Sequence, residues 1–214
     1  MNDEHETEDE SRWYHGPLKL ILGLFLLLIL LSWLVPYYSV ALDPRPKDIP
    51  SYDEIMDSFD VVVNESFKSD NLADYVRDDV TLRKIATKIS TESCDEGRIC
   101  YAKALYYFVR DNIEYVNDPV GEDYYETGEE VLLTKGADCE SGTLLLASFY
   151  ESIGIDSEIV IIPGHAFLRV RLPEALSRYK KDGDYVYLDW TCSSCDFGEI
   201  PWQNVEKEKR IVYV

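Results

Sequence analysis

The sequence predicts an α+β fold in which helices come first and an antiparallel sheet follows, with one transmembrane helix in front of the domain. Three observations support this fold class. Apolar residues recur at helical spacing over most of residues 52–153, whereas β-branched and apolar residues cluster in short runs after Gly154. An unbroken apolar run also occupies residues 20–31 near the N-terminus. Helices followed by strands are typical of α+β domains.

The first 50 residues divide into a tail, a membrane span and a linker. Residues 1–17 are predicted to be a disordered tail because acidic and polar residues dominate its beginning. Residues 18–35 are predicted to span a membrane, since this length of helix reaches roughly 27 Å, just enough for a hydrocarbon core. Residues 36–50 are predicted to be a linker, because prolines alternate with polar residues from Asp43 onward.

A cleaved signal peptide is the main alternative to a membrane anchor. Ser39-Val40-Ala41 places small residues where a signal peptidase cuts. The apolar run is long for a signal peptide, however, and the acidic residues before it differ from the usual basic start. These two features favour an uncleaved, single-pass anchor.

Charge and cysteine content limit the partners and the compartment. The formal net charge of -20 argues against nucleic acid as a partner, because phosphate binding requires clustered Lys and Arg. Basic residues flank the span equally, so they do not decide its orientation: Arg12 and Lys19 precede it, and Arg45 and Lys47 follow it. Five cysteines in the domain favour an extracytoplasmic, oxidising location. The oligomeric state is left open.

The helices of the domain are predicted from apolar periodicity and from capping signals. Two or three helices are expected up to about residue 90, and the clearest helix is expected over about residues 98–115. Thr127 and Glu130 form a capping-box pattern that starts a short helix. A further helix is expected from about Cys139 to Ile153, where Gly154 ends it.

The strands of the domain, which extends over residues 51–214, are predicted in its C-terminal part. β-branched and aromatic residues there are separated by Gly- and Pro-containing turns. The expected strands are residues 158–162, 166–172 and 185–189, with a short edge strand at 211–214.

Three residues form a candidate catalytic set. Cys139 starts a predicted helix, where the positive end of the helix dipole lowers a thiol pKa and free N–H groups can stabilise an oxyanion. His165 follows the Pro163-Gly164 turn and is the only histidine outside the N-terminal tail and membrane-proximal segment. Asp189 ends a strand, where its carboxylate is expected to accept the Nδ1–H of His165. Each also has an ordinary structural explanation: a buried cysteine, a satisfied histidine and a turn-capping aspartate.

These residues and their neighbours resemble the transglutaminase-like superfamily, a branch of the papain-like cysteine enzymes. The resemblance covers roughly residues 101–191 and includes the segment 107–115, which is similar to the segment before the catalytic loop in that family. The matching motifs are Gly136-Ala137-Asp138-Cys139, a hydrophobic helix ending at Gly154, Gly164-His165-Ala166-Phe167, and Asp189-Trp190-Thr191. The membrane anchor together with paired cysteines is most similar to archaeal members.

The resemblance implies a papain-like core in which Cys139 is the nucleophile, His165 the general base and acid, and Asp189 the orienting residue. The implied reaction is acyl transfer from peptide or protein amides through a thioester, with capture by water or by an amine. No side chain is assigned as an oxyanion donor. The alternative is a catalytically inactive module of the same fold that binds peptides or organises a protein complex.

The other four cysteines have three interpretations. Cys94 and Cys100 precede the long helix, and Cys192 and Cys195 form a Cys-x-x-Cys motif after Thr191. Outside the cell we expect two disulfides, within or between the pairs. Inside the cell, the four thiolates could hold a structural zinc in a cytoplasmic adaptor. The Cys-x-x-Cys motif could also be redox-active, although it lacks a thioredoxin context. Apart from this zinc, no cofactor is expected.

Overall fold

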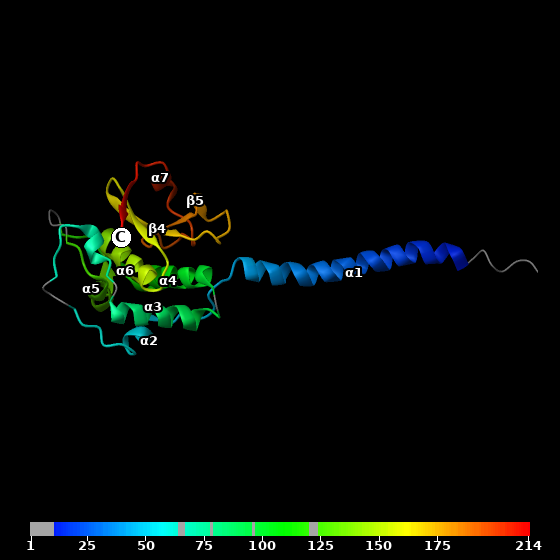
Figure 1. Cartoon of the computed structure of the whole chain (residues 1–214), viewed down its shortest axis with the longest axis horizontal. Helices are drawn as coiled ribbons and strands as arrows, with labels where there is room; N and C mark the ends of the chain where they lie inside the picture. Colours follow the sequence, from blue (N-terminus) through cyan, green and yellow to red (C-terminus); the bar gives the residue numbers. More distant parts are fainter. Residues whose placement is uncertain (1–10, 64–66, 78, 96, 120–123) are drawn as a thin grey trace, which may run out of the picture. The chain divides into compact units, whose positions relative to one another are not determined.

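The computed structural model describes residues 11–63, 67–77, 79–95, 97–119 and 124–214. The chain divides into two units, residues 1–42 and residues 43–214, and each is described by itself. The first unit contains one long helix, α1 (Ser11–Leu42), drawn in blue in Figure 1. Residues 1–10 of the predicted tail lie outside the described residues, and residues 11–17 belong to α1, which therefore begins before the predicted span.

Within α1, the segment Gly16–Val35 is long and apolar enough to cross a membrane. None of its residues is buried inside the protein, so it is not a core helix of the domain. A signal sequence near the N-terminus has the same length and composition. The segment is therefore a candidate membrane span.

Residues 43–50, expected to be part of the linker, lie against the domain. The Lys47 N–H donates to the Ser93 carbonyl at 2.8 Å, and Pro50 is buried. Asp43 forms an ion pair with Lys103, a side chain that is only 3% exposed. Because a buried ammonium requires a nearby carboxylate, this pairing fixes the segment to the helices.

Three helices of the second unit pack on α6 (Cys139–Ser152), in which every residue from Ser141 to Tyr150 is buried. The predicted capping box is confirmed, because Thr127 and Glu130 bond each other's backbone N–H groups at the start of α5. The predicted long helix is also confirmed, although it ends at Asn112 because the chain then turns into a strand. The other helices are α2 (Tyr52–Met56), η1 (Leu72–Tyr75), α3 (Val80–Ser93), α4 (Arg98–Asn112), α5 (Gly128–Thr134) and α7 (Trp202–Val205).

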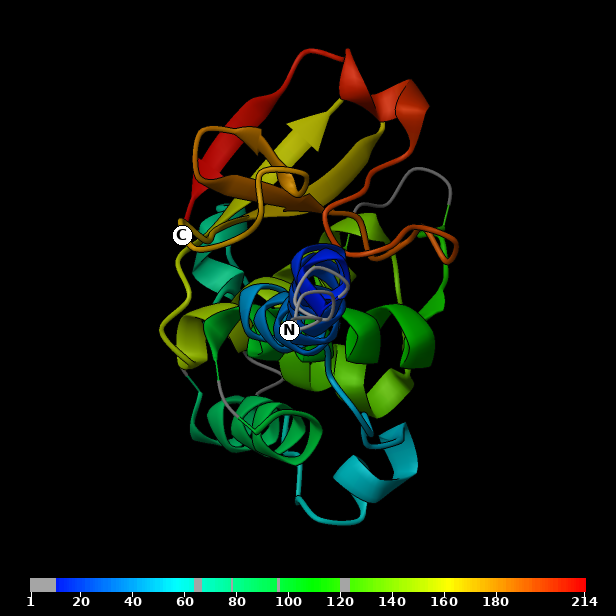
Figure 2. The same ribbon diagram turned by 90° about the vertical axis from the view of Figure 1, so that its right-hand side faces the viewer.

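An antiparallel five-stranded sheet lies on the other side of α6 from α3, as Figures 1 and 2 show. Its strand order is β5-β6-β4-β3-β7, and β3 and β4 pack directly on α6. Three of the predicted strands and the predicted edge strand are present, which confirms the α+β fold class. β5 was not expected, because its Lys-Lys-Asp sequence carries no apolar signal. The bounds are β3 (Ser157–Ile162), β4 (His165–Arg171), β5 (Lys180–Asp182), β6 (Tyr185–Leu188) and β7 (Arg210–Tyr213).

Candidate active site

A short parallel strand pair places Cys139 at the start of α6. Lys135 ends α5 in the left-handed conformation (φ 59°), which turns the chain toward α6. The next two residues form β2 (Gly136–Ala137), which pairs with β1 (Glu114–Tyr115). Asp138 then caps α6 by accepting the Ser141 N–H at 2.7 Å. Cys139 is thus the first residue of a well-anchored helix.

Cys139 is 7% exposed, and its thiol donates to Oε2 of Glu140 at 2.7 Å. Burial, and then the Glu140 carboxylate, raise the pKa of the thiol to about 12, while the Ala166 N–H opposes this rise. The expected lowering of the thiol pKa by the helix N-terminus is therefore wrong for this conformation. A helix dipole contributes about 0.3–1 kcal/mol, which burial beside a carboxylate outweighs.

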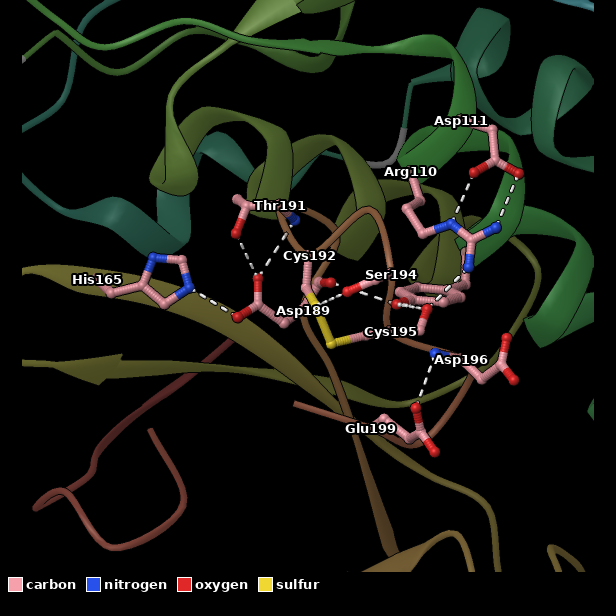
Figure 3. The surroundings of a disulfide bond; sticks show 11 residues. Arg110, Asp111, His165, Asp189, Thr191, Cys192, Ser194, Cys195, Asp196 and Glu199 are labelled. Carbon is pink, nitrogen blue, oxygen red and sulfur yellow. Dashed lines mark hydrogen bonds and ion pairs between the residues drawn. A yellow bond between two sulfur atoms is a disulfide. The ribbon is translucent and has the colours of Figure 1, made fainter. Parts of the chain in front are cut away.

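His165 and Asp189 form the closest contact between the candidate residues. His165 is the first residue of β4, and its Nε2 lies 2.8 Å from Oδ2 of Asp189, just beyond the end of β6 (Figure 3). The expectation that Nδ1 faces Asp189 is wrong. Because Nε2–H donates to the carboxylate, the other nitrogen is left as a proton acceptor. The β4–β6 pairing, in which Leu168 is opposite Leu188, brings His165 and Asp189 close together.

Asp189 is fully buried, and both of its carboxylate oxygens have partners. Oδ2 contacts His165, and Oδ1 accepts from the N–H and hydroxyl of Thr191 at 3.2 and 2.7 Å. The Tyr106 hydroxyl lies 3.2 Å from the backbone carbonyl of Asp189 and 3.1 Å from that of Cys195. The hydrogen bonds to Oδ1 and Oδ2 offset the free-energy cost of burying the Asp189 carboxylate.

Trp190 connects the Asp189 segment to the first turn of α6. Its Nε1–H donates to the Cys139 carbonyl at 3.4 Å. A Cβ at Gly142 would overlap the Trp190 ring, so only glycine permits this contact. The motif Asp189-Trp190-Thr191 was noted in the sequence, but the dependence on Gly142 required the tertiary structure.

Two acidic residues near the start of α6 have unusually high pKa values. Burial, and then Glu140, raise the pKa of Asp138 to about 6. Burial, and then Glu130 and Asp138, raise the pKa of Glu126 to about 7. Ligand atoms of Asp138, Cys139 and Glu140 lie within 4.8 Å of one another, a spacing that also suits a cation. The thiol–carboxylate hydrogen bond accounts for this spacing without one.

Tyr115 is a neighbour of the site that sequence reasoning did not single out. Burial, followed by the charge that Cys139 can carry, raises the pKa of its hydroxyl, so this group lies within electrostatic reach of the thiol. Its ring is 6.2 Å from that of Trp190, and its hydroxyl donates to Asn117 at 2.9 Å. The signal in the sequence was its place at the end of the segment 107–115, which precedes the Cys139 loop.

The four remaining cysteines form two disulfides, each within its own pair: Cys94–Cys100 and Cys192–Cys195. This corresponds to the first of the three interpretations, whereas a zinc site would require four thiolates. Among the five cysteines, all of which are described, Cys139 is the free one. The Cys192–Cys195 loop is held against α4 by hydrogen bonds, since Arg110 donates to the Cys195 carbonyl at 2.7 Å (Figure 3).

Comparison with known proteins identifies the central part of the domain. Residues 83–175 match the family model described as the transglutaminase-like superfamily. The match extends from α3 to just beyond β4, so it includes Cys139 and His165 and ends before Asp189. A search of curated proteins found no match to the chain.

Proposed function

The chain belongs, through residues 83–175, to the transglutaminase-like superfamily, and from this premise we propose that it is a cysteine enzyme acting on peptide or protein amides. The observation that carries the proposal is the partly buried His165–Asp189 hydrogen bond of 2.8 Å. The peptide N–H of Ala166, next to His165, contacts the Cys139 thiol, and this contact supports the assignment of all three residues to one site.

The proposed reaction proceeds in two stages. In the first, Nδ1 of His165 takes the thiol proton of Cys139, and the thiolate attacks the amide carbonyl carbon. The imidazolium then gives its proton to the amide nitrogen, the C–N bond breaks, and a thioester remains. In the second, water or an amine attacks the thioester while His165 takes its proton, and the sulfur leaves and is reprotonated. Asp189 holds the ring and stabilises the imidazolium throughout.

In this scheme, the hydrogen bond from the Cys139 thiol to the Glu140 carboxylate represents the resting state of the site. Thiol attack requires the proton to pass to His165, so substrate binding has to separate the thiol from the Glu140 carboxylate. We therefore propose that the Glu140 side chain moves away from the thiol when substrate binds.

Two donors are available for the oxyanion. The Asp138 side chain caps the N–H of Ser141, which leaves the N–H of Cys139 to bond an oxygen at the reacting carbon. The Tyr115 hydroxyl is the candidate side-chain donor, because it lies within electrostatic reach of the thiol. The Tyr115 hydroxyl now donates a single, exposed hydrogen bond to Asn117, and a bound substrate can replace Asn117 as the acceptor.

The proposal includes a membrane anchor and an extracytoplasmic domain. The apolar segment Gly16–Val35 would hold the chain in the membrane. Two disulfides fit an oxidising compartment. The intact mass of the native protein tests the anchor: a membrane fraction that retains residues 1–42 supports it. A soluble protein that has lost them identifies a signal sequence instead.

Alkylation of Cys139 tests the catalytic assignment directly. The full chain in detergent is treated with iodoacetamide from pH 6 to 10, and labelling of the Cys139 peptide is measured by mass spectrometry. His165→Ala is expected to slow labelling at pH 8 at least 10-fold relative to the wild type, because general-base assistance is typically worth more than this. His15→Ala, in the other unit, is the matched control. Equal rates in wild type and His165→Ala would remove the basis for the proposal.

The second candidate function is a non-catalytic peptide-binding module, and the raised thiol pKa favours it. A thiol with a pKa of about 12 is protonated at neutral pH. Ammonia or amine release from an amide peptide library decides between the two functions. Turnover that Cys139→Ser abolishes while peptide binding persists supports the enzyme. Peptide binding without turnover by the wild type supports the module.

A further inference from the structure

A cavity of about 700 Å³ in the second unit has a charge opposite to that of the whole protein. Five basic and three acidic side chains line it, and the Asp43 carboxylate pairs with two of the basic ones. The cavity therefore keeps an excess of one positive charge in a chain of net charge -20. The basic residues are Arg45, Lys103, Arg110, Arg178 and Lys181. Cys139, His165 and Asp189 are not part of its lining, so the cavity is separate from the candidate active site.

Lys103 carries a buried positive charge at this cavity. Its ammonium pairs with Asp43 and also donates to the Pro44 carbonyl at 3.0 Å. The same Asp43 carboxylate pairs with Arg178 and accepts from the Tyr179 hydroxyl. The single Asp43 carboxylate is therefore shared between two cations, Lys103 and Arg178.

The charges around Lys103 are not balanced. Burial lowers the pKa of its ammonium, Asp43 opposes this effect, and the guanidinium groups of Arg45 and Arg178 lower the pKa further. Repulsion among three cations is relieved by an anion that enters the cavity. In the described part of the chain, Arg45 and Lys181 take part in no ion pair, and both are exposed. They are therefore available to such an anion.

Aromatic rings also line the cavity and contact some of its cations. The Lys103 ammonium lies 5.1 Å from the centroid of the Tyr179 ring, and the Arg110 guanidinium lies 4.5 Å from that of Tyr107. Cation–ring contacts of this kind stabilise a charged head without neutralising it, but Arg110 is also paired with Asp111 at 2.6 Å. Lys103 and Arg110 are therefore held in place, whereas the exposed side chains of Arg45 and Lys181 have to be ordered when a ligand binds.

We propose that this cavity is a binding site for a phosphate group. Guanidinium and ammonium groups that converge on one space are the donors that recognise phosphate in proteins. Arg45 follows Leu42, the last residue of α1, by three positions. The phosphate therefore comes either from a lipid headgroup or from a soluble phosphate compound, and the two sources share the same contacts.

The test is the thermal unfolding of the full chain in a non-ionic detergent. Inorganic phosphate is added at constant ionic strength in one series, and dihexanoyl phosphatidylglycerol below its micelle concentration in the other. Arg45→Gln/Lys181→Gln is compared with Lys84→Gln/Lys207→Gln, which removes the same charge from exposed positions outside the cavity lining. Both double variants leave the Lys103–Asp43 pair intact.

The expected result is a saturable rise of the unfolding temperature in at least one series. The Arg45→Gln/Lys181→Gln variant should need at least 10-fold more ligand for the same rise, and the control variant should match the wild type. A response to phosphate identifies a soluble source, and a response to the lipid alone identifies a headgroup. No saturable response in either series, or equal responses in the two double variants, would overturn the proposal.

Discussion

Replacing Glu140 with glutamine removes the negative charge that faces the Cys139 thiol. The carboxylate oxygen lies 2.7 Å from the sulfur, and it is the second cause, after burial, of the raised thiol pKa. Two charges about 4 Å apart interact by about 4 kcal/mol at an effective dielectric constant of 20, or roughly three pKa units. Glu140 is partly exposed, so solvent screening reduces the expected change to about one to two units.

The expected gain in reactivity is smaller than the gain in thiolate. A pKa that falls by about one to two units increases the thiolate fraction about 10- to 100-fold at pH 8. The intrinsic nucleophilicity of a thiolate falls with its pKa, with a slope of about 0.5 on the logarithmic scale. Glu140→Gln should therefore react with iodoacetamide about 3- to 10-fold faster than the wild type at pH 8. Burial remains, so the thiol pKa stays above its ordinary value.

The assay is the pH dependence of Cys139 alkylation between pH 7 and 11. In Glu140→Gln the rise in rate should begin at lower pH than in the wild type. Glu92→Gln, which removes an exposed carboxylate on α3, is the control and should match the wild type. An unchanged or slower rate in Glu140→Gln would refute the conclusion that this carboxylate holds the thiol protonated.

Four further outcomes are expected. Gly142→Ala should destabilise the protein by about 1–3 kcal/mol in denaturant unfolding, because the added Cβ overlaps the Trp190 ring; no change would contradict this packing. Thr191→Val should cost about 1.5–3 kcal/mol in the same measurement, since it removes the hydroxyl bonded to the buried Asp189 carboxylate, whereas Thr191→Ser should cost less. The pKa of Glu126 is raised to about 7 in the folded state, so the folded protein binds more protons than the unfolded chain between about pH 4.5 and 7. Stability should therefore fall as pH rises through this window, and Glu126→Gln should flatten that fall in thermal unfolding; a parallel pH dependence would contradict the assignment. Finally, the unfolded, unreduced protein should react with one equivalent of a thiol reagent and the reduced protein with five, and a different first count would contradict the disulfide pairing.

The order and type of the main elements were predictable because their signals are local. The helix from Cys139 needed only an apolar run between a glycine-containing break and Gly154, and the structure gives Cys139–Ser152. β5 was not predicted, because a three-residue polar edge strand has no hydrophobic pattern of its own. It forms through its pairing with β6. β1 and β2 have two residues each, and they form through each other rather than through propensity.

The candidate site was predictable as a set of residues but not as an arrangement of atoms. Cys139, His165 and Asp189 were identified from their positions at element ends, and the structure brings His165 against Asp189. The nitrogen that faces Asp189 depends on the side-chain torsions of His165 in the folded site, which no short stretch of sequence specifies. Glu140 was known to be the neighbour of Cys139, but its bond to the thiol depends on a side-chain orientation within the folded site.

By itself, the sequence determined the α+β order of elements, the apolar N-terminal segment and the residues available for thiol chemistry, because periodicity, capping and turn signals operate over a few residues. Only the tertiary structure decided the charge state of Cys139, the ring orientation of His165 and the existence of a basic cavity in an acidic chain. These properties depend on burial and on distant partners, such as Asp43 and Arg178, which are 135 positions apart. Electrostatic energies follow distance in space and access to water, and the fold alone determines both.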